Sequence, residues 1–280
     1  MIFGAHTSTT GGVDKAIIRG RELGCDCIQI FVKNNMRWFG TPYSQSELQS
    51  WKEESAKHNP QVIFAHAGYL INLASPPEGN REKSIQSLKQ ELEFCAQLKL
   101  PFLVLHPGAH LKQGEEEGIK NVIKALNEVF DSLPSGPRVA LEITAGQGTC
   151  LGYKLEHLTE IMEKVEKPER LGICLDTAHL FGAGFDIRLP EVWDGVLTKL
   201  NQLVGLNNLL GVHLNDSKAE LGSHVDRHDH IGKGKIGVEA FAYIVNDSRL
   251  KNIPGCLETP KSKDFHEDRD NLKILRELVR

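Results

Sequence analysis

Short apolar runs rich in Val, Ile, Leu and Phe recur along the chain, and each is followed by a stretch with the period of an amphipathic helix. Parallel strands buried on both faces read as nearly continuous apolar runs, and helices usually connect them. The pattern predicts eight such units. We expect the strands at residues 2–6, 27–32, 62–66, 102–106, 139–143, 172–176, 210–214 and 255–259.

Helical periodicity is clear between these runs. Ser44-x-x-Glu47 forms a capping-box signature that predicts a helix from there to about His58. Eight strand-then-helix units in 280 residues predict an α/β fold with a single-domain TIM (β/α)8 barrel over residues 1–280. A doubly wound parallel sheet is the second interpretation, but no G-x-G-x-x-G follows a predicted strand.

Composition narrows the class of protein. Apolar residues make up 40% of the chain and charged residues 25%, which is typical of a globular protein. No apolar run approaches the roughly 18 residues of a membrane span, and the first residues lack a signal-peptide pattern, so we expect a cytoplasmic protein with no membrane partner. The six cysteines are scattered and predict buried, reduced thiols. The formal charge of −4 gives no basic excess, so a polyanion would need a local basic patch.

Polar residues close most of the predicted strands. The carboxyl ends of the strands in a TIM barrel meet at one mouth, where the chemistry is located. Histidine and carboxylate side chains are ligands of zinc and similar metals. We therefore expect a metal site there, although a single polar residue often only marks the change from strand to loop. The six strand-end candidates are His66, His106, Glu142, Asp176, His213 and Glu258. His6, after the short first run, fits a structural hydrogen-bonded histidine better than a ligand.

Two loops extend the candidate set. His179 follows Asp176 by three residues, and Asp226 and His228 are two apart, so on an extended chain they point the same way. A charged, solvated loop is the alternative. Nine candidate ligands exceed what one zinc ion takes, so the set favours two or three ions. Several ions close together suit phosphodiester hydrolysis, and a central Glu142 can bridge two of them.

At these residues the sequence resembles the endonuclease IV family of apurinic/apyrimidinic (AP) endonucleases. Three stretches resemble the family's signatures: residues 66–74 (HAGYLINLA), 172–179 (GICLDTAH), and 213–218 (HLNDSK) with 226–228 (DRH). Further agreement lies at residues 4–6, 106–108, 142–148 and 257–259. The likeness covers nearly the whole chain.

The resemblance implies a TIM barrel with three zinc ions that hydrolyses the phosphodiester 5′ to an AP site, leaving a 3′-hydroxyl and a 5′-deoxyribose phosphate. It also implies 3′-repair diesterase activity in base excision repair. Glu142 would bridge two ions, and Glu258 would help orient or deprotonate the attacking water. The implied ligand sets are His66, His106 and Glu142; then Glu142, Asp176, His213 and Glu258; then His179, Asp226 and His228. Mn²⁺ and Fe²⁺ accept the same ligand types.

The implied partner is double-stranded DNA with abasic sites or blocked 3′ ends, and no obligatory protein partner is expected for a monomer. Family members open the duplex with inserted loop side chains, which suits Tyr69 and Leu70 and, in a variable loop, Met36 and Arg37. Basic residues after strand ends would contact phosphate. They are Lys33, Arg37, Lys218, Arg227, Lys233, Lys235 and Lys261. Lys233 stands where many relatives are acidic, and Gly68 replaces a common serine.

Two other functions fit parts of this pattern. A xylose-isomerase-like sugar isomerase or epimerase needs only a Glu, Asp, His, Glu quartet, which Glu142, Asp176, His213 and Glu258 would supply. The chemistry of an isomerase leaves the other five candidate ligands unexplained. The number of metal ions per chain distinguishes an isomerase from an endonuclease. A non-enzymatic DNA-binding or metal-storing barrel is the third interpretation.

Overall fold

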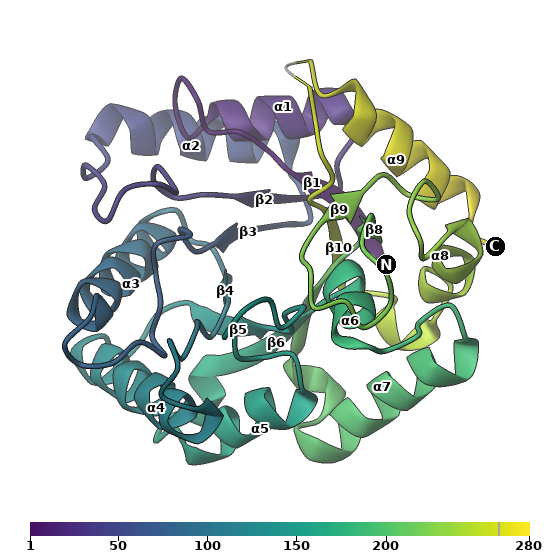
Figure 1. Ribbon diagram of the computed structural model, residues 1–280. Coiled ribbons are helices and arrows are strands. Elements are labelled where there is room, and N and C mark those ends of the chain that lie inside the picture. The colour runs from purple at the N-terminus through teal and green to yellow at the C-terminus, as the bar shows by residue number, and fades with distance from the viewer. Residues whose placement is uncertain (263) are drawn as a thin grey trace.

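Eight parallel strands close into a barrel in the computed structural model, which describes residues 1–262 and 264–280. Their order around the ring is β1-β10-β7-β6-β5-β4-β3-β2, with helices around the outside (Figure 1). The TIM-barrel prediction is confirmed. The strands are β1 (Ile2–His6), β2 (Cys27–Ile30), β3 (Val62–His66), β4 (Phe102–Leu105), β5 (Arg138–Glu142), β6 (Leu171–Asp176), β7 (Leu209–His213) and β10 (Pro254–Leu257).

The helices form the outer layer and connect successive strands. The predicted capping box is present at α2, where Ser44 Oγ accepts a hydrogen bond from the Glu47 amide and Glu47 Oε2 accepts one from the Ser44 amide. The predicted helix at this position is therefore confirmed. The helices are α1 (Lys15–Leu23), α2 (Gln45–His58), α3 (Arg81–Gln97), α4 (Glu115–Ser132), α5 (Leu155–Lys164), α6 (Thr177–Ala183), α7 (Pro190–Leu203), α8 (Val238–Ile244) and α9 (His266–Glu277).

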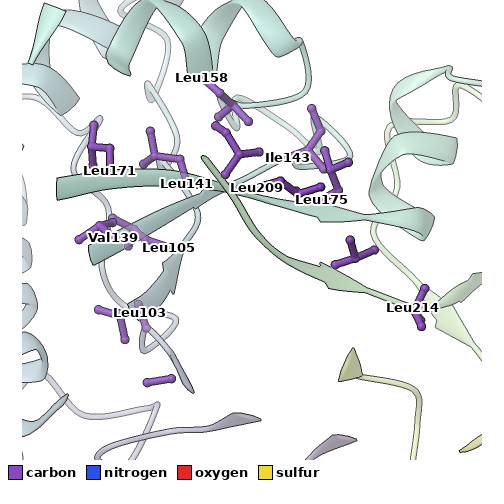
Figure 2. Close-up of a cluster of buried hydrophobic side chains, with 14 of the residues drawn as sticks. Leu103, Leu105, Val139, Leu141, Ile143, Leu158, Leu171, Leu175, Leu209 and Leu214 are labelled. Carbon is purple, nitrogen blue, oxygen red and sulfur yellow. The ribbon is translucent and has the colours of Figure 1, made fainter. Parts of the chain in front are cut away.

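Strand side chains alternate between two apolar layers. One set packs outward against the helices, as Figure 2 shows for Leu141 and Leu209 of the strands and Leu158 of α5. The other set fills the inside of the barrel, where the rings of Phe64 and Phe102 stack at 4.6 Å between centroids. Burial on both faces explains why the strands read as continuous apolar runs.

The same alternation builds the barrel mouth. Residues two apart on a strand share a face. Ala140 of β5 belongs to the interior cluster, so Glu142 points into the barrel one layer higher. On β6, Cys174 likewise belongs to the interior cluster, so Asp176 also points into the barrel. β4 and β10 end one residue before His106 and Glu258, which continue the pattern.

Two further observations concern the cysteines and the apolar character of the helices. The six cysteines are unbridged among the described residues; Cys27, Cys95, Cys174 and Cys256 are buried, as predicted, whereas Cys25 and Cys150 are half-buried. In the described part of the chain, no helix combines the length and the apolar character that a bilayer crossing requires.

Candidate metal centre

The carboxylate of Glu142 lies at the centre of the barrel mouth, between histidines on two sides. Its Oε2 lies 3.2 Å from His66 Nε2 and 3.0 Å from His106 Nε2. Its Oε1 lies 2.8 Å from His213 Nδ1. Burial alone would raise the pKa of Glu142, but His213 and His106 lower it well below its usual range. Glu142 is therefore an ionised carboxylate that can serve two cations at once.

The structure brings the predicted ligands together in three groups. In each group the donor atoms lie within 4.8 Å of one another. The groups are His66, His106 and Glu142; Glu142, Asp176, His213 and Glu258; and Asp176, His179 and His228. Asp226 joins the third group, because its two oxygens lie 3.3 Å from His179 Nε2 and 3.3 Å from His228 Nε2.

Three histidine rings in this region have one nitrogen fixed to a backbone carbonyl. The Nδ1 atom of His66 donates to the carbonyl of Ala67 at 2.8 Å. The Nδ1 atom of His179 donates to the carbonyl of Ile143 at 2.8 Å, and that of His228 donates to the carbonyl of Glu258 at 3.2 Å. The other nitrogen, Nε2, then faces the site, which is how proteins orient histidine ligands.

The third group shows most directly that these residues suit a cation. The Nε2 atoms of His179 and His228 are buried and have no hydrogen-bond partner among the described residues. Both nevertheless lie against the carboxylate of Asp226. Two unpartnered imidazole nitrogens beside one carboxylate form the donor set that zinc and similar ions prefer.

Local structure explains how the third group forms. Asp176 ends β6 and caps α6, accepting a hydrogen bond from the His179 amide at 2.8 Å, so the first turn of the helix brings His179 to the mouth. A two-stranded antiparallel ribbon that the sequence analysis did not predict pairs β8 (Asp216–Ser217) with β9 (His228–Asp229). This ribbon folds the loop after β7 back over the mouth and carries His228 to the site.

His179 and Asp226 of the third group carry opposite charges in the absence of a metal. Burial would lower the pKa of His179, but Asp176 and Asp226 raise it well above its ordinary value. Burial would raise the pKa of Asp226, but His179 lowers it to about 2. Without a metal, His179 is protonated and Asp226 is ionised, so an ion that binds there displaces a proton.

Two buried amides that the sequence analysis missed hold candidate ligands by hydrogen bonds. Gln29 Oε1 lies 2.7 Å from His213 Nε2, and Gln29 Nε2 donates to Glu258 Oε1 at 2.5 Å. Asn215 donates to Asp176 Oδ2 at 2.6 Å and accepts from the Glu258 amide at 2.8 Å. The signal for Gln29 was present, because a polar residue between Ile28 and Ile30 is unusual in an apolar strand.

His6 lies beside the metal centre without joining it. Its Nδ1 is 2.8 Å from Gln29 Nε2, and it belongs to none of the donor groups found in the described chain. Burial lowers the pKa of His6 to about 4, with Glu258 opposing the shift. A neutral, hydrogen-bonded His6 agrees with the structural role expected for it.

The loops after β2 and β3 place exposed side chains at the rim. The exposed fraction is 64% for Met36 and 63% for Tyr69, and Leu70 is half-buried. The Tyr69 ring lies 5.4 Å from the Phe31 ring and 6.4 Å from the His66 ring, measured between centroids. A cavity of about 630 Å³ opens beside the metal centre and is lined by His6, Phe31, Asn35, Tyr69, His228 and Glu258, among others.

The basic residues differ in where their charges lie. Arg37, Lys218, Arg227, Lys233 and Lys235 are exposed. Lys33, which the sequence analysis predicts to contact phosphate, has a side chain that is 3% exposed and an ammonium 2.8 Å from Glu91 Oε1. Lys261 is likewise paired with Asp268, at 2.8 Å. Lys33 and Lys261 thus have carboxylate partners within the protein.

Known proteins resemble this chain in sequence and in structure over nearly its whole length. Residues 18–279 match the family described as the xylose isomerase-like TIM barrel. The chain is 48% identical to a probable endonuclease 4 of Chloroflexus aggregans, covering 99% of this chain and 98% of that protein. It superposes on the crystal structure of endonuclease IV from Thermus thermophilus with a TM-score of 0.86 and 34% identity, covering 99% and 98% of the two chains.

A D-tagatose 3-epimerase-like protein is also similar, with a TM-score of 0.73 and 21% identity over 100% of this chain and 98% of the other. That likeness reflects the shared barrel alone. The relatives with high identity are named for endonuclease 4, and they align over nearly every residue. The chain belongs to the endonuclease IV family within the xylose isomerase-like TIM barrels.

Proposed function

We propose that this protein is a metal-dependent endonuclease of base excision repair that cuts DNA at abasic sites. The observation that carries the proposal is the position of Glu142, whose two oxygens face His66 and His106 on one side and His213 on the other. Such a shared carboxylate suits a centre of several ions, which phosphodiester hydrolysis uses. The names of the relatives, probable endonuclease 4 and endonuclease IV, support the same function.

The donor set fits three Zn²⁺ ions per chain, with Mn²⁺ or Fe²⁺ as alternatives at the same ligands. When bound, such ions activate water and neutralise charge on the reacting phosphate. The first ion would be held by His66, His106 and Glu142, the second by Glu142, Asp176, His213 and Glu258, and the third by His179, Asp226 and His228.

Glu258 has the position to handle the attacking water. Its side chain is 18% exposed, and Gln29 holds Oε1 while Oε2 lies 3.3 Å from His213 Nδ1. Burial would raise the pKa of Glu258, but His213 and His6 lower it well below its usual range. An ionised Glu258 accepts a hydrogen bond from the water and so orients it toward phosphorus. Glu258 and Glu142 are the two catalytic carboxylates of the proposal.

The reaction we propose hydrolyses the phosphodiester on the 5′ side of an abasic site, leaving a 3′-hydroxyl and a 5′-deoxyribose phosphate. The same hydrolysis at a blocked 3′ end releases the blocking group, so we also propose 3′-repair diesterase activity. In this proposal Tyr69, Leu70, Met36 and Arg37 enter the duplex at the lesion, and Arg227 contacts phosphate. The enzyme acts as a cytoplasmic monomer without an obligatory protein partner.

Incision of an end-labelled duplex with one tetrahydrofuran abasic analogue tests the function. This analogue cannot undergo β-elimination, so a lyase leaves it intact. Metal-loaded protein is expected to make one cut 5′ to the analogue, leaving a 3′-hydroxyl that a polymerase extends, and to spare an undamaged duplex. Glu142→Gln should abolish incision and lower metal content while the barrel stays folded. Normal turnover by this variant would overturn the proposal.

A sugar isomerase is the second candidate. The quartet Glu142, Asp176, His213 and Glu258 alone forms one of the donor groups and would suffice for one ion. Metal-loaded protein that holds a single ion, leaves the abasic duplex intact and interconverts a ketose and an aldose would favour this candidate.

A further inference from the structure

A buried ion pair lies beneath the two rim loops, outside the metal centre. Lys33 comes from the loop after β2 and Glu91 from the middle of α3, and their charged atoms are 2.8 Å apart. The side chains are 3% and 1% exposed. The catalytic proposal gives neither residue a role.

Glu91 holds the backbone of the loop after β3. Both of its oxygens accept from the Gly68 amide, each at 3.2 Å. The backbone passes so close that a Cβ on Gly68 would lie 2.9 Å from the Lys33 ammonium and 3.2 Å from the carbonyl of Asn35. Residue 68 directly precedes Tyr69, so Glu91 fixes the point from which the exposed tyrosine projects.

Lys33 holds the backbone of the other loop. Its ammonium donates to the carbonyl of Arg37 at 2.7 Å, closing the turn that carries Met36. The Tyr69 amide donates across to the carbonyl of Asn35 at 3.1 Å, so the two loops also touch directly. One ion pair therefore connects the backbones of both loops.

Helix α3 is the common support. Besides Glu91, Ser87 donates to the carbonyl of Trp38 at 2.6 Å, and Gln90 accepts from the Gly40 amide at 2.7 Å. Residues 33–40 and 67–72 thus rest on one face of α3, while Met36 and Tyr69 stay about two-thirds exposed.

Stability alone does not explain this arrangement. A buried ion pair loses much hydration energy, and a well-packed apolar pair of the same volume is often as stable. Burial raises the pKa of Glu91, with Lys33 opposing it, so burial carries an energetic cost here. An apolar pair would leave the Gly68 amide and the Arg37 carbonyl without these partners. What the ion pair adds is a fixed position for both backbones.

We propose that Lys33 and Glu91 are positioning residues that set the spacing of the loops 33–40 and 67–72, so that Met36 and Tyr69 enter damaged DNA together. The DNA part of this inference rests on the proposed function. Loops held in the binding conformation lose less entropy when DNA binds, so the pair increases affinity for the gap left by a missing base.

The coupling itself can be measured without DNA. In Lys33→Met/Glu91→Leu both charges leave together, so no single buried charge remains to unfold the chain. Hydrogen exchange in peptides covering residues 66–72 is expected to become at least about tenfold faster than in the wild type, since the Gly68 and Tyr69 amides lose their support. Lys89→Met is the matched control, because Lys89 is on the same helix and pairs with exposed Glu128 at 3.1 Å.

Function is tested on the metal-loaded protein with the tetrahydrofuran duplex. The paired variant should lower affinity for this duplex about tenfold while kcat at saturating DNA and metal content stay within about twofold. The fluorescence of 2-aminopurine opposite the lesion should rise less on binding than with wild type. In a Met36→Ala/Tyr69→Ala background, the paired change should add little further loss, because both residues that the ion pair positions are absent.

Several outcomes would overturn the inference. One is unchanged hydrogen exchange in the folded paired variant, and another is wild-type affinity for the abasic duplex. Equal loss of affinity for abasic and undamaged duplexes would also overturn it, since that result reflects general charge. If wild-type protein leaves the abasic duplex uncut, the proposed function fails, whereas the exchange measurement still decides whether the pair couples the loops.

Discussion

The Nε2 atom of His213 lies 2.7 Å from Oε1 of Gln29, on the opposite side of the ring from Glu142. The amide group of Gln29 directs its two hydrogens to His6 and Glu258, so its oxygen is the acceptor and His213 carries its proton on Nε2. The Nδ1 atom of His213 is thereby aimed at the metal centre.

Replacing this amide should weaken metal binding. We expect Gln29→Leu to lower the affinity of the second donor group about 10- to 100-fold, since the ring of His213 and the carboxylate of Glu258 lose their shared partner. Competition with a chelator, followed by metal analysis, measures the effect. Gln49→Leu is the control, because the Gln49 side chain donates to Glu53 on the exposed side of α2, its one side-chain hydrogen bond within the described residues. Equal affinity in both variants would contradict the prediction.

Metal binding should depend on pH. The pKa of His179 and that of His213 lie well above the ordinary value, so both rings are protonated in the metal-free protein at neutral pH. Binding then releases protons, and affinity should rise with pH and fall in acid. Calorimetry of zinc binding to metal-free protein in buffers of different ionisation enthalpy counts the protons. A heat independent of the buffer would show that no proton leaves.

Loss of Asp226 should affect the third group alone. Asp226→Asn removes the negative charge between His179 and His228, and among the described residues Asp226 forms no ion pair with His66, His106 or His213, the histidines of the other two groups. We expect the metal content to fall by one ion per chain, with the folded barrel retained. Metal analysis of dialysed protein tests this. Loss of all ions, or no loss, would mean that the groups do not bind separately.

Asp216 organises the loop beyond the ribbon. Its buried carboxylate accepts hydrogen bonds from the amides of Ser217, Gly232, Ile236 and Gly237 over 2.8 to 3.3 Å. Asp216→Ala leaves these donors without an acceptor and should lower the free energy of unfolding by about 3 kcal/mol.

Thermal unfolding of Asp216→Ala should show the melting temperature falling by about 5 to 10 °C. Asp194→Ala is the control, since Asp194 is 65% exposed and pairs at the surface with Arg249. A similar melting temperature for wild type and Asp216→Ala would show that water replaces the carboxylate without cost.

The residues at the strand ends could be predicted in two steps. Burial on both faces makes each strand a continuous apolar run in the sequence, and the alternation of side chains along the strand then shows which residue at its end points into the barrel. Glu142 follows Ala140 in this way, and no knowledge of distant residues is needed. Their spacing also predicted that Asp226 and His228 lie together, and the structure places Asp226 Oδ1 3.3 Å from His228 Nε2. The ribbon that carries His228 was missed, because two-residue strands leave no periodic signal.

Partners far apart in the sequence set the limits of prediction. Lys33 follows a strand like a surface lysine, and only the fold brings Glu91 of α3 beneath it. Glu91 itself is on a helix whose buried face also includes Ser84 and Ser87, so a hydrophobic pattern gives no warning of a buried charge. Pairings of this kind depend on how two elements pack and have no local signature.

The closed ring of strands has a consequence for how the centre is assembled. Its donors are spread from β3 to β10, and Glu258 arrives only when β10 pairs with β7 and β1. The second donor group, Glu142, Asp176, His213 and Glu258, is complete only in this closed ring. An ion bound by that group favours the closed ring by mass action. Retention of this ion therefore reports that β10 has paired, and removing the ion and unfolding the barrel act on the same equilibrium.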